Sequence, residues 1–263
     1  MYSSFQIAIK YLRYYLSASN GKGHGTHSPF VFDLIGHVLR DKRQYDAYVT
    51  IEEARKKLLQ QNQTIEVQDL GAGSSVINKK KRSVADIAGS SLKPAKYAQL
   101  LYRIAKHYQA RNILELGTSF GITTSYLAAA DANARVHTIE GSAAIAGIAR
   151  QTFETCKNIE LIQGNFDDVL PSLLSHTGSI DLAFIDGNHR LEPTLNYFEQ
   201  VLKHITPRSI LIFDDIHWSK EMEEAWRTIQ DHPRVMMSVD LFFIGIIFFN
   251  PDFKIKQRFT IRF

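Results

Sequence analysis

The sequence predicts a doubly wound α/β fold, in which a mostly parallel sheet carries helices on both faces. After residue 110, short and continuously apolar strands alternate with helices of about a dozen residues, which is typical of parallel sheets covered on both sides. The 263 residues, 44% hydrophobic and 22% charged, suffice for a sizeable core. This composition is that of an ordinary globular protein rather than a disordered one.

Residues 1–90 are expected to form a basic, mainly helical N-terminal extension. Apolar side chains recur at helical spacing over residues 4–17. Ser28 and Pro29 are typical of an N-cap and a first helical residue, and they predict a second helix. A third helix, polar and basic, is expected over residues 51–61.

The segment 64–75 predicts a strand that runs into a glycine turn, Asp69–Ser74. We interpret this turn as structural or as a loop that covers a substrate, because the basic residues 76–83 cannot form a buried helix. The run Lys79–Arg82 is interpreted as a solvated loop, with contact to an anionic substrate as the alternative.

Residues 91–263 are expected to form the α/β domain, which opens with a helix over 94–108. The strands that follow are predicted at 112–116, 135–139, 159–163, 181–185 and 209–213, and the helices at 121–131, 142–156, 191–205 and 219–230. The tail adds strands at 235–241, 243–249 and 255–263 without helices between them, so the sheet should end in an antiparallel edge. One long bent strand is the alternative for the first two.

Composition excludes several classes of protein. The single cysteine, Cys156, excludes an intrachain disulfide and a metal site built from cysteines. The apolar run Leu241–Phe249 is too short to span a bilayer, and the N-terminus lacks the apolar core of a secretory signal. We therefore expect a cytoplasmic protein without a membrane partner.

Charge is distributed unevenly along the chain. The 31 Lys and Arg against 27 Asp and Glu give a net charge of +4. Residues 1–110 hold 17 of the basic and 8 of the acidic residues, whereas the remainder holds 14 and 19. A basic extension beside an acidic domain raises the question of an anionic partner.

Polar and acidic residues concentrate where the predicted strands end. Ligands of open α/β sheets bind beyond the carboxyl ends of the strands. The residues at these ends are Glu115–Gly121, Glu140–Gly141, Gly164–Asp168, Asp186–His189 and Asp214–Trp218. This repetition at all five strands predicts a ligand site along this edge of the sheet.

The first strand leads into a G-x-x-x-G turn, Gly117 to Gly121, in which Ser119 and Ile122 occupy the remaining positions of the dinucleotide motif G-x-G-x-x-G. A pyrophosphate needs the closer backbone approach that those glycines allow, whereas a cofactor without phosphates does not. Glu140 lies 23 residues after Gly117, a suitable distance for an acidic residue that binds a ribose diol. A tight strand–helix turn without a ligand is the alternative.

The runs ILELGTSFGITTSYLA, VHTIEG, IQGNFDDVL, IDLAFIDGNH and ILIFDDIHW resemble the class I S-adenosylmethionine-dependent methyltransferases. They are most similar to the cation-dependent O-methyltransferases, which include the catechol and caffeoyl-CoA enzymes. The resemblance covers about residues 90–250, with five motifs in order, and implies a seven-stranded sheet.

The resemblance implies a role for each residue of the cofactor site. Glu115, Gly117 and Gly121 match the turn under the methionine part of the cofactor, and Thr118 and Ser119 would donate to its carboxylate. Glu140 matches the acid that binds the ribose. The remaining implied contacts are Asn165 and Phe166 beside the adenine, and Asp186, which would contact both cofactor and metal.

The resemblance also implies a metal site. Asp186, Asp214 and Asp215 take the positions of the family's metal ligands, with Asp215 in place of an asparagine. Three carboxylates suit Mg²⁺, which would lower the pKa of a substrate hydroxyl. The extra charge of Asp215 leaves two hypotheses open, a stronger metal site or a lost one; helix capping is a third interpretation for Asp214 and Asp215.

A base is needed to accept the proton of the hydroxyl. His189 occupies the position of the family's lysine base, and a histidine can accept a proton at neutral pH. The catalytic residues predicted are therefore His189 and Asp186. A surface loop histidine without a catalytic role is the alternative.

Taken together, the sequence and the resemblance predict an S-adenosylmethionine-dependent enzyme that O-methylates a small hydroxylated molecule, and they leave open whether that molecule is anionic. The alternatives are an RNA-directed methyltransferase and a non-catalytic protein that binds the cofactor. Nucleic acid is disfavoured because no N/D-P-P-Y/F segment follows the fourth strand and no aromatic residues interrupt the basic run. The sequence leaves open whether the protein forms a homodimer.

Overall fold

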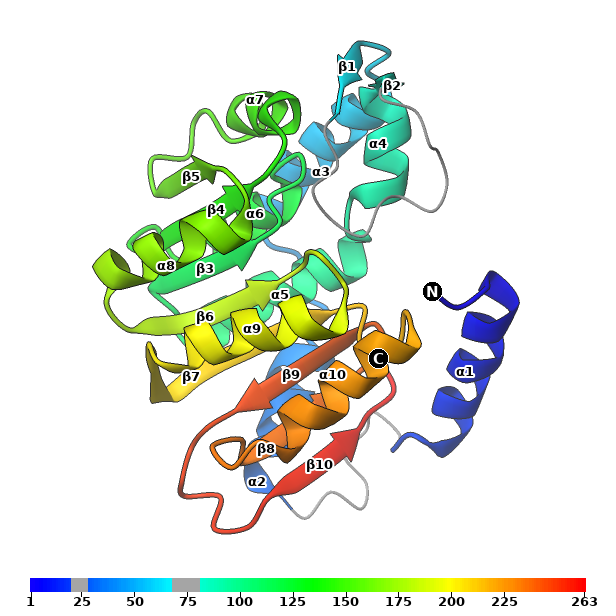
Figure 1. Cartoon of the computed structure of the whole chain (residues 1–263), viewed down its shortest axis with the longest axis vertical. Helices are drawn as coiled ribbons and strands as arrows, with labels where there is room; N and C mark the ends of the chain where they lie inside the picture. The colour runs from blue at the N-terminus through cyan, green and yellow to red at the C-terminus, as the bar shows by residue number, and fades with distance from the viewer. Residues whose placement is uncertain (20–27, 68–80) are drawn as a thin grey trace. The chain divides into compact units, whose positions relative to one another are not determined.

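The computed structural model describes residues 1–19, 28–67 and 81–263 (Figure 1). The chain divides into two compact units. The terminal unit comprises Met1–Asp41 and Gly178–Phe263, and the central unit comprises Lys42–Thr177. The predicted division at residue 90 stays a prediction.

The central unit contains a parallel sheet with helices between its strands. Its elements are, in chain order, α3 (Asp46–Leu59), β1 (Thr64–Glu66), β2 (Lys81–Ser83), α4 (Val84–Ser91), α5 (Ala95–His107), β3 (Asn112–Leu116), α6 (Ile122–Ala129), β4 (Arg135–Glu140), α7 (Ala143–Thr152), β5 (Ile159–Gln163) and α8 (Phe166–Thr177). Strand β4 pairs in parallel with both β3 and β5. The carboxyl ends of these strands therefore lie at the same edge of the sheet.

Helix α3 packs against α6 within the central unit. Tyr126 of α6 is fully buried, and its hydroxyl donates to Glu52 Oε1 of α3 at 2.8 Å. Arg55 donates to the same carboxylate at 2.9 Å. Tyr48 lies edge-on to Tyr126, with ring centroids 5.5 Å apart. The polar face that the sequence predicts for this helix thus includes the groups that attach it to α6.

Three predictions for the central unit need comment. The interpretation of Lys79–Arg82 as a loop is wrong for Lys81 and Arg82, which belong to β2 and pair antiparallel with β1. Helices α4 and α8 were not predicted, because α4 is short and rich in small residues and α8 contains Pro171. The predicted glycine turn Asp69–Ser74 lies outside the described residues.

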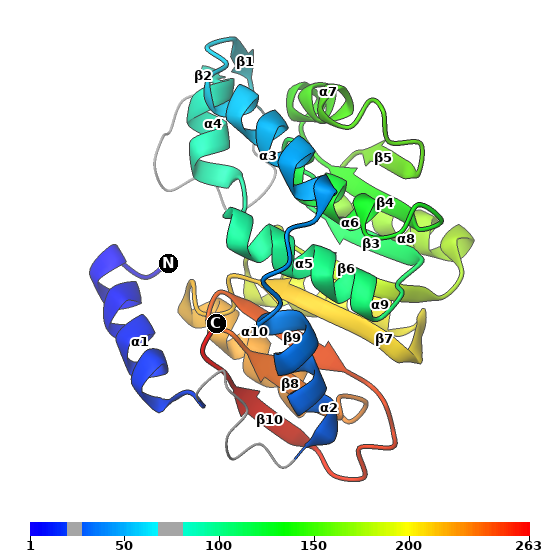
Figure 2. The same cartoon turned by 180° about the vertical axis from the view of Figure 1, so that it is seen from behind.

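The terminal unit contains α1 (Ser4–Ser17), α2 (Pro29–Asp33), the π-helical segment η1 (Leu34–Leu39), β6 (Ile180–Ile185), α9 (Leu191–Leu202), β7 (Ile205–Asp214), α10 (Lys220–Asp231), β8 (Met237–Asp240), β9 (Ile244–Phe248) and β10 (Gln257–Thr260). As predicted, Ser28 caps α2 and Pro29 is its first residue. Figure 2 shows α2 over β8 and β9, where Phe30 lies edge-on to Phe248 at 4.8 Å between ring centroids.

Strand pairing confirms the predicted fold class. β6 and β7 are parallel, and β9 is antiparallel to both β7 and β8. The alternative of one long bent strand in the tail is therefore wrong. β10 pairs in parallel with β8. The large sheet has eight strands in the described residues, one more than the resemblance implies, because β10 extends the C-terminal edge.

Helix α1 packs on the turn between β8 and β9. The helix begins with a capping box, in which Ser3 and Gln6 bond to each other's backbone amides. Tyr14 and Ala18 are buried against Phe242 of the turn. None of the described helices is long and apolar enough to cross a bilayer.

Candidate cofactor and metal sites

The glycine turn between β3 and α6 is a tight turn with several left-handed residues. Gly117, Ser119 and Gly121 all have positive φ, at 102°, 49° and 80°. At Gly121 a Cβ atom would lie 2.6 Å from the ring of Phe153, so the position excludes a side chain for two reasons. The structure thus gives a physical reason for the two glycines of the G-x-x-x-G motif.

Glu140 lies at the end of β4 and connects two loops of this edge. Its Oε2 accepts from the Ser119 amide at 3.0 Å, and its Oε1 accepts from the Ser142 amide at 2.9 Å. Burial raises the pKa of Glu140, although the amide bonds oppose this shift. Because each carboxylate oxygen can accept a second hydrogen bond, Glu140 retains capacity for a ribose diol.

A buried polar network lies beneath the glycine turn. Glu115 is fully buried, and its Oε2 accepts from Thr124 at 2.5 Å and from Thr138 at 2.7 Å. Thr138 is also 2.6 Å from the hydroxyl of Thr118, which is 1% exposed. The side chain of Thr118 therefore has its partner inside the protein, and its predicted bond to a cofactor carboxylate stays a prediction.

The other predicted cofactor residues lie directly after strands β3 and β5. Ser119 Oγ lies 3.0 Å from Ser91 Oγ of α4, a contact that sequence reasoning missed because α4 itself was not predicted. Asn165 precedes α8 and accepts from the Asp167 amide at 3.2 Å, and Phe166 is the first residue of that helix. Their predicted places beside an adenine stay predictions.

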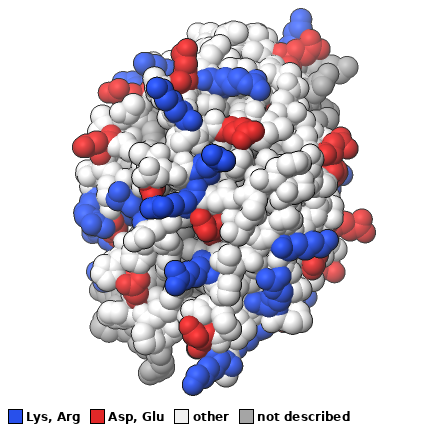
Figure 3. All heavy atoms as spheres, turned by 90° about the vertical axis from the view of Figure 1, so that its left-hand side faces the viewer, with Lys and Arg blue, Asp and Glu red and all other residues white. Residues whose placement is uncertain are grey.

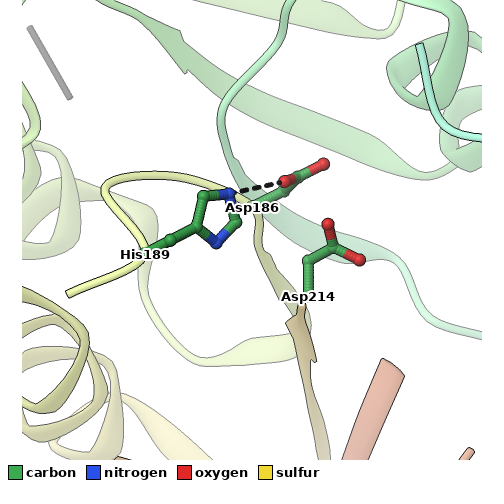
Figure 4. Close-up of side chains that lie close together, drawn as sticks. All are labelled: Asp186, His189 and Asp214. Carbon is green, nitrogen blue, oxygen red and sulfur yellow. Dashed lines mark ion pairs between the residues drawn. The ribbon is translucent and has the colours of Figure 1, made fainter. Parts of the chain in front are cut away.

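In the terminal unit, Asp186, His189 and Asp214 converge (Figure 4). Asp186 directly follows β6, and Asp214 is the last residue of β7. The parallel register pairs Ile185 with Phe213, which places these two aspartates side by side at the ends of adjacent strands. The structure thus brings together three of the four predicted catalytic and metal residues of this unit.

The donor set of this cluster fits a divalent cation. One ligand atom from each residue lies within 4.8 Å of the others, and Asp214 is 1% exposed. Ligands of an octahedral cation at about 2.1 Å lie about 3.0 Å apart when adjacent and about 4.2 Å apart when opposite. A small contraction would therefore let all three side chains bind one ion.

Asp215, predicted as a metal ligand, is not part of this group. Its φ is 52°, and its amide donates to the Phe243 carbonyl at 2.7 Å. It borders a small pocket lined by Ile7, Asp215, His217, Trp218, Phe242 and Phe243. Because β7 ends at Asp214 and the backbone turns at Asp215, the Asp215 carboxylate lies outside the group.

A charged network beside that pocket was missed by sequence reasoning. His217 lies 2.8 Å from Asp240 and 3.1 Å from Glu223, and Lys10 of α1 donates to Glu223 at 2.8 Å. Burial opposes a charged imidazole, but Asp240 and Glu223 outweigh it and raise the pKa of His217. The partners are 6 to 213 positions apart along the chain, so no local pattern indicates them.

The residues predicted for the cofactor and metal sites lie in a part of the chain that matches a known protein family. A model described as "Methyltransferase domain" matches residues 114–216. This range contains every residue predicted for the cofactor and metal sites.

Two curated relatives are similar over 126 residues, or 46% of this chain. A catechol O-methyltransferase from Niastella koreensis is 31% identical with 55% of its length matched, and one from Mycobacterium tuberculosis is 29% identical with 56% matched. The chain thus spans about half the length of the curated relatives that it matches.

The fold is also similar to that of solved structures. An O-methyltransferase from Bacillus cereus, solved in complex with SAH, superposes with a TM-score of 0.57 at 22% identity, over 83% of this chain and 97% of that chain. At this identity the likeness shows the fold alone. Together with the matched domain and the curated relatives, it supports the resemblance found in the sequence: residues 114–216 match a methyltransferase domain, and the fold is that of solved methyltransferases.

Proposed function

We propose that the protein is an S-adenosylmethionine-dependent O-methyltransferase whose acceptor is a small hydroxylated molecule. The central unit would bind the methyl donor through the glycine turn and Glu140. The terminal unit would bind the acceptor with the help of a divalent cation held by Asp186 and Asp214. The matched methyltransferase domain and the two relatives named catechol O-methyltransferase support this proposal.

The observation that carries the proposal is the pair of aspartates at the ends of β6 and β7. Parallel pairing in register brings Asp186 and Asp214 to one place, and His189 turns back toward them. Carboxylates that share one site repel each other unless a cation lies between them. This arrangement supports a cation-assisted reaction of an oxygen nucleophile.

Methyl transfer is an in-line displacement, in which the acceptor oxygen attacks the methyl carbon as the carbon–sulfur bond breaks. The sulfonium becomes the neutral thioether S-adenosylhomocysteine, and the hydroxyl proton leaves to a base. Asp186 and Asp214 would hold the cation, which would lower the pKa of the acceptor hydroxyl and orient it. The contribution of this chain is alignment of the two reactants, which supplies much of the rate enhancement in such reactions.

Two details of the site stay predictions. The first is His189 as the base that accepts the proton. The second is the anionic character of the acceptor, which was inferred from the basic N-terminal region. Figure 3 shows Lys and Arg interspersed with Asp and Glu over one face. That face offers no patch of one sign that would favour the RNA-directed alternative.

The proposal is tested in two steps. Isothermal titration calorimetry should detect binding of S-adenosylmethionine and of S-adenosylhomocysteine with a stoichiometry of one. Incubation with methyl-labelled cofactor and a panel of catechols and other hydroxylated compounds should then label an acceptor on oxygen. If neither cofactor form binds at millimolar concentration, the proposal is wrong. If the cofactor binds and label appears on RNA or on nitrogen instead, the O-methyl acceptor class is wrong.

A further inference from the structure

We propose that His189 is a metal ligand rather than a free base, and that its nitrogen gives the site a preference for a first-row transition cation over Mg²⁺. This inference rests on the proposed cation site at Asp186 and Asp214. It changes the role that the sequence predicts for His189, and it adds a third ligand from this chain.

The spacing of the pair is compatible with coordination of one cation. His189 Nε2 lies 3.5 Å from Asp186 Oδ1, somewhat longer than the usual 2.7–3.2 Å of an N–H···O bond. Two ligands adjacent on one cation lie about 3.0 Å apart, so a shift of about 0.5 Å would let both atoms bind the same ion. Figure 4 shows the imidazole and both carboxylates on one side of the loop, with the ring nitrogen directed at Asp186. The side chains of Asp186 and His189 are 20% and 22% exposed, so an ion could reach them from solvent.

The backbone of the loop holds the imidazole in this position. Asn188 and His189 are consecutive residues with positive φ, at 65° and 28°, and they fold the chain back toward the end of β6. Asn188 Nδ2 donates to the hydroxyl of Tyr197 at 3.1 Å, and Tyr197 is fully buried in α9. The loop is therefore attached to a buried residue of α9 through Asn188, the neighbour of His189.

The donor set determines which cation binds best. Oxygen-only sites suit Mg²⁺, which prefers carboxylates and water. A site with two carboxylates and one imidazole suits transition cations such as Mn²⁺, Fe²⁺ or Co²⁺. A nitrogen that donates its lone pair to the metal cannot also accept a proton. Coordination and general-base catalysis by Nε2 are thus exclusive roles, and one experiment can separate them.

The test uses the 263-residue chain without an affinity tag and Mn²⁺ as the probe. Calorimetry measures the dissociation constants of Mn²⁺ and Mg²⁺, and pulsed electron paramagnetic resonance detects coupling between Mn²⁺ and an imidazole ¹⁴N nucleus. The variants are His189→Asn, which tolerates positive φ, and Asp214→Asn. The matched control is His176→Gln, an exposed histidine of α8.

The wild type and His176→Gln should show ¹⁴N coupling and bind Mn²⁺ more tightly than Mg²⁺, by about tenfold or more. His189→Asn should lose the coupling and most of the preference, with an unchanged melting temperature. Mn²⁺ binding that needs Asp214 but shows no ¹⁴N coupling, and is unchanged in His189→Asn, would overturn this inference and leave the proposed cation site standing. Absence of any Mn²⁺ or Mg²⁺ binding, with intact binding of S-adenosylhomocysteine, would overturn both the inference and the cation site.

Discussion

The two units of the protein build their sites in opposite ways. In the central unit, the groups around the glycine turn already hold one another, as in the bonds from the Ser119 and Ser142 amides to Glu140. In the terminal unit, Asp186 and His189 face each other at 3.5 Å, beyond ordinary hydrogen-bond length. The groups of the proposed cofactor site thus already bond to one another, whereas the pair of the proposed cation site is farther apart than an ordinary hydrogen bond.

This difference follows from the ligands that each site would bind. A cofactor without phosphates is recognised through shape and a few hydrogen bonds, so the site benefits from a rigid backbone. A cation is recognised by charges that repel each other until the ion binds. We therefore expect cofactor binding and metal binding to respond to different mutations.

The largest expected effect is that of Asp214→Asn. Loss of one carboxylate should weaken Mn²⁺ binding and lower the methyl-transfer rate by about a hundredfold, since the site loses a directly bound charge. Binding of S-adenosylhomocysteine should change by less than about twofold. Rate assays and calorimetry on the same preparation measure both. Asp252→Asn, on an exposed loop, is the matched control; a variant of Asp214 that also lost the cofactor would break the comparison.

Gly121→Ala should have the next largest effect, and it should fall on the central unit. The positive φ of 80° and the ring of Phe153 at 2.6 Å oppose a methyl group. We expect a loss of about 2–3 kcal/mol in the free energy of unfolding, and weaker cofactor binding. Urea denaturation measures the first quantity.

The matched control for Gly121 is Gly147→Ala. Gly147 lies inside α7, and a Cβ there would meet nothing within 4 Å. Alanine should leave the protein as stable as before or more stable by up to about 1 kcal/mol, because it favours the helix. Equal losses in the free energy of unfolding for Gly121→Ala and Gly147→Ala would contradict the explanation that positive φ and the Phe153 ring exclude a side chain at Gly121.

His217→Gln should have a smaller and pH-dependent effect in the terminal unit. Asp240 and Glu223 raise the pKa of His217 despite its burial, so the folded protein binds this proton more tightly than the unfolded chain. The stabilisation is fully present below the unfolded value of about 6.5 and is lost as pH rises through the folded pKa. The difference in melting temperature between wild type and variant should therefore be largest near pH ~6 and shrink toward pH ~9. A difference that grows with pH would refute the assigned network.

The smallest effect is expected for Lys10→Met on α1. Lys10 and Glu223 form an ion pair at 2.8 Å with side chains 30% and 22% exposed. Such pairs contribute about 0.5 kcal/mol, and salt screens them. Thermal melts with and without added salt should show a small difference that salt removes. Arg13→Met on the same helix is the control, and a salt-independent loss would indicate a packing role instead.

Much of this architecture could be predicted because it depends on local patterns. Strands β3 and β5 begin and end at the predicted residues, since each is a short apolar run between turn residues. α1 likewise matches its predicted range. The two glycines also predicted a tight strand–helix turn, and in the structure Gly117 and Gly121 both have positive φ.

What could not be predicted depends on where individual side chains point and on contacts between residues that are far apart in the sequence. Asp214 and Asp215 look equivalent in the sequence, but the end of β7 directs them to different places. The predicted strand ends at residue 213, so both aspartates were expected in the loop beyond it, and the left-handed turn at Asp215 that separates them has no signal in the sequence. The network of Lys10, His217 and Glu223 joins segments that only folding brings together, and no local signal indicates it.

The most direct test of the central claim is a calorimetric titration of S-adenosylhomocysteine into metal-free protein. If the central unit holds the methyl donor independently of the cation site, chelator-treated wild type and Asp214→Asn should both bind one equivalent with the same affinity as the untreated protein. Binding that disappears on chelation or in Asp214→Asn would contradict the claim that the central unit binds the cofactor independently of the cation site. Absence of binding to untreated protein, chelator-treated protein and Asp214→Asn alike would also contradict it.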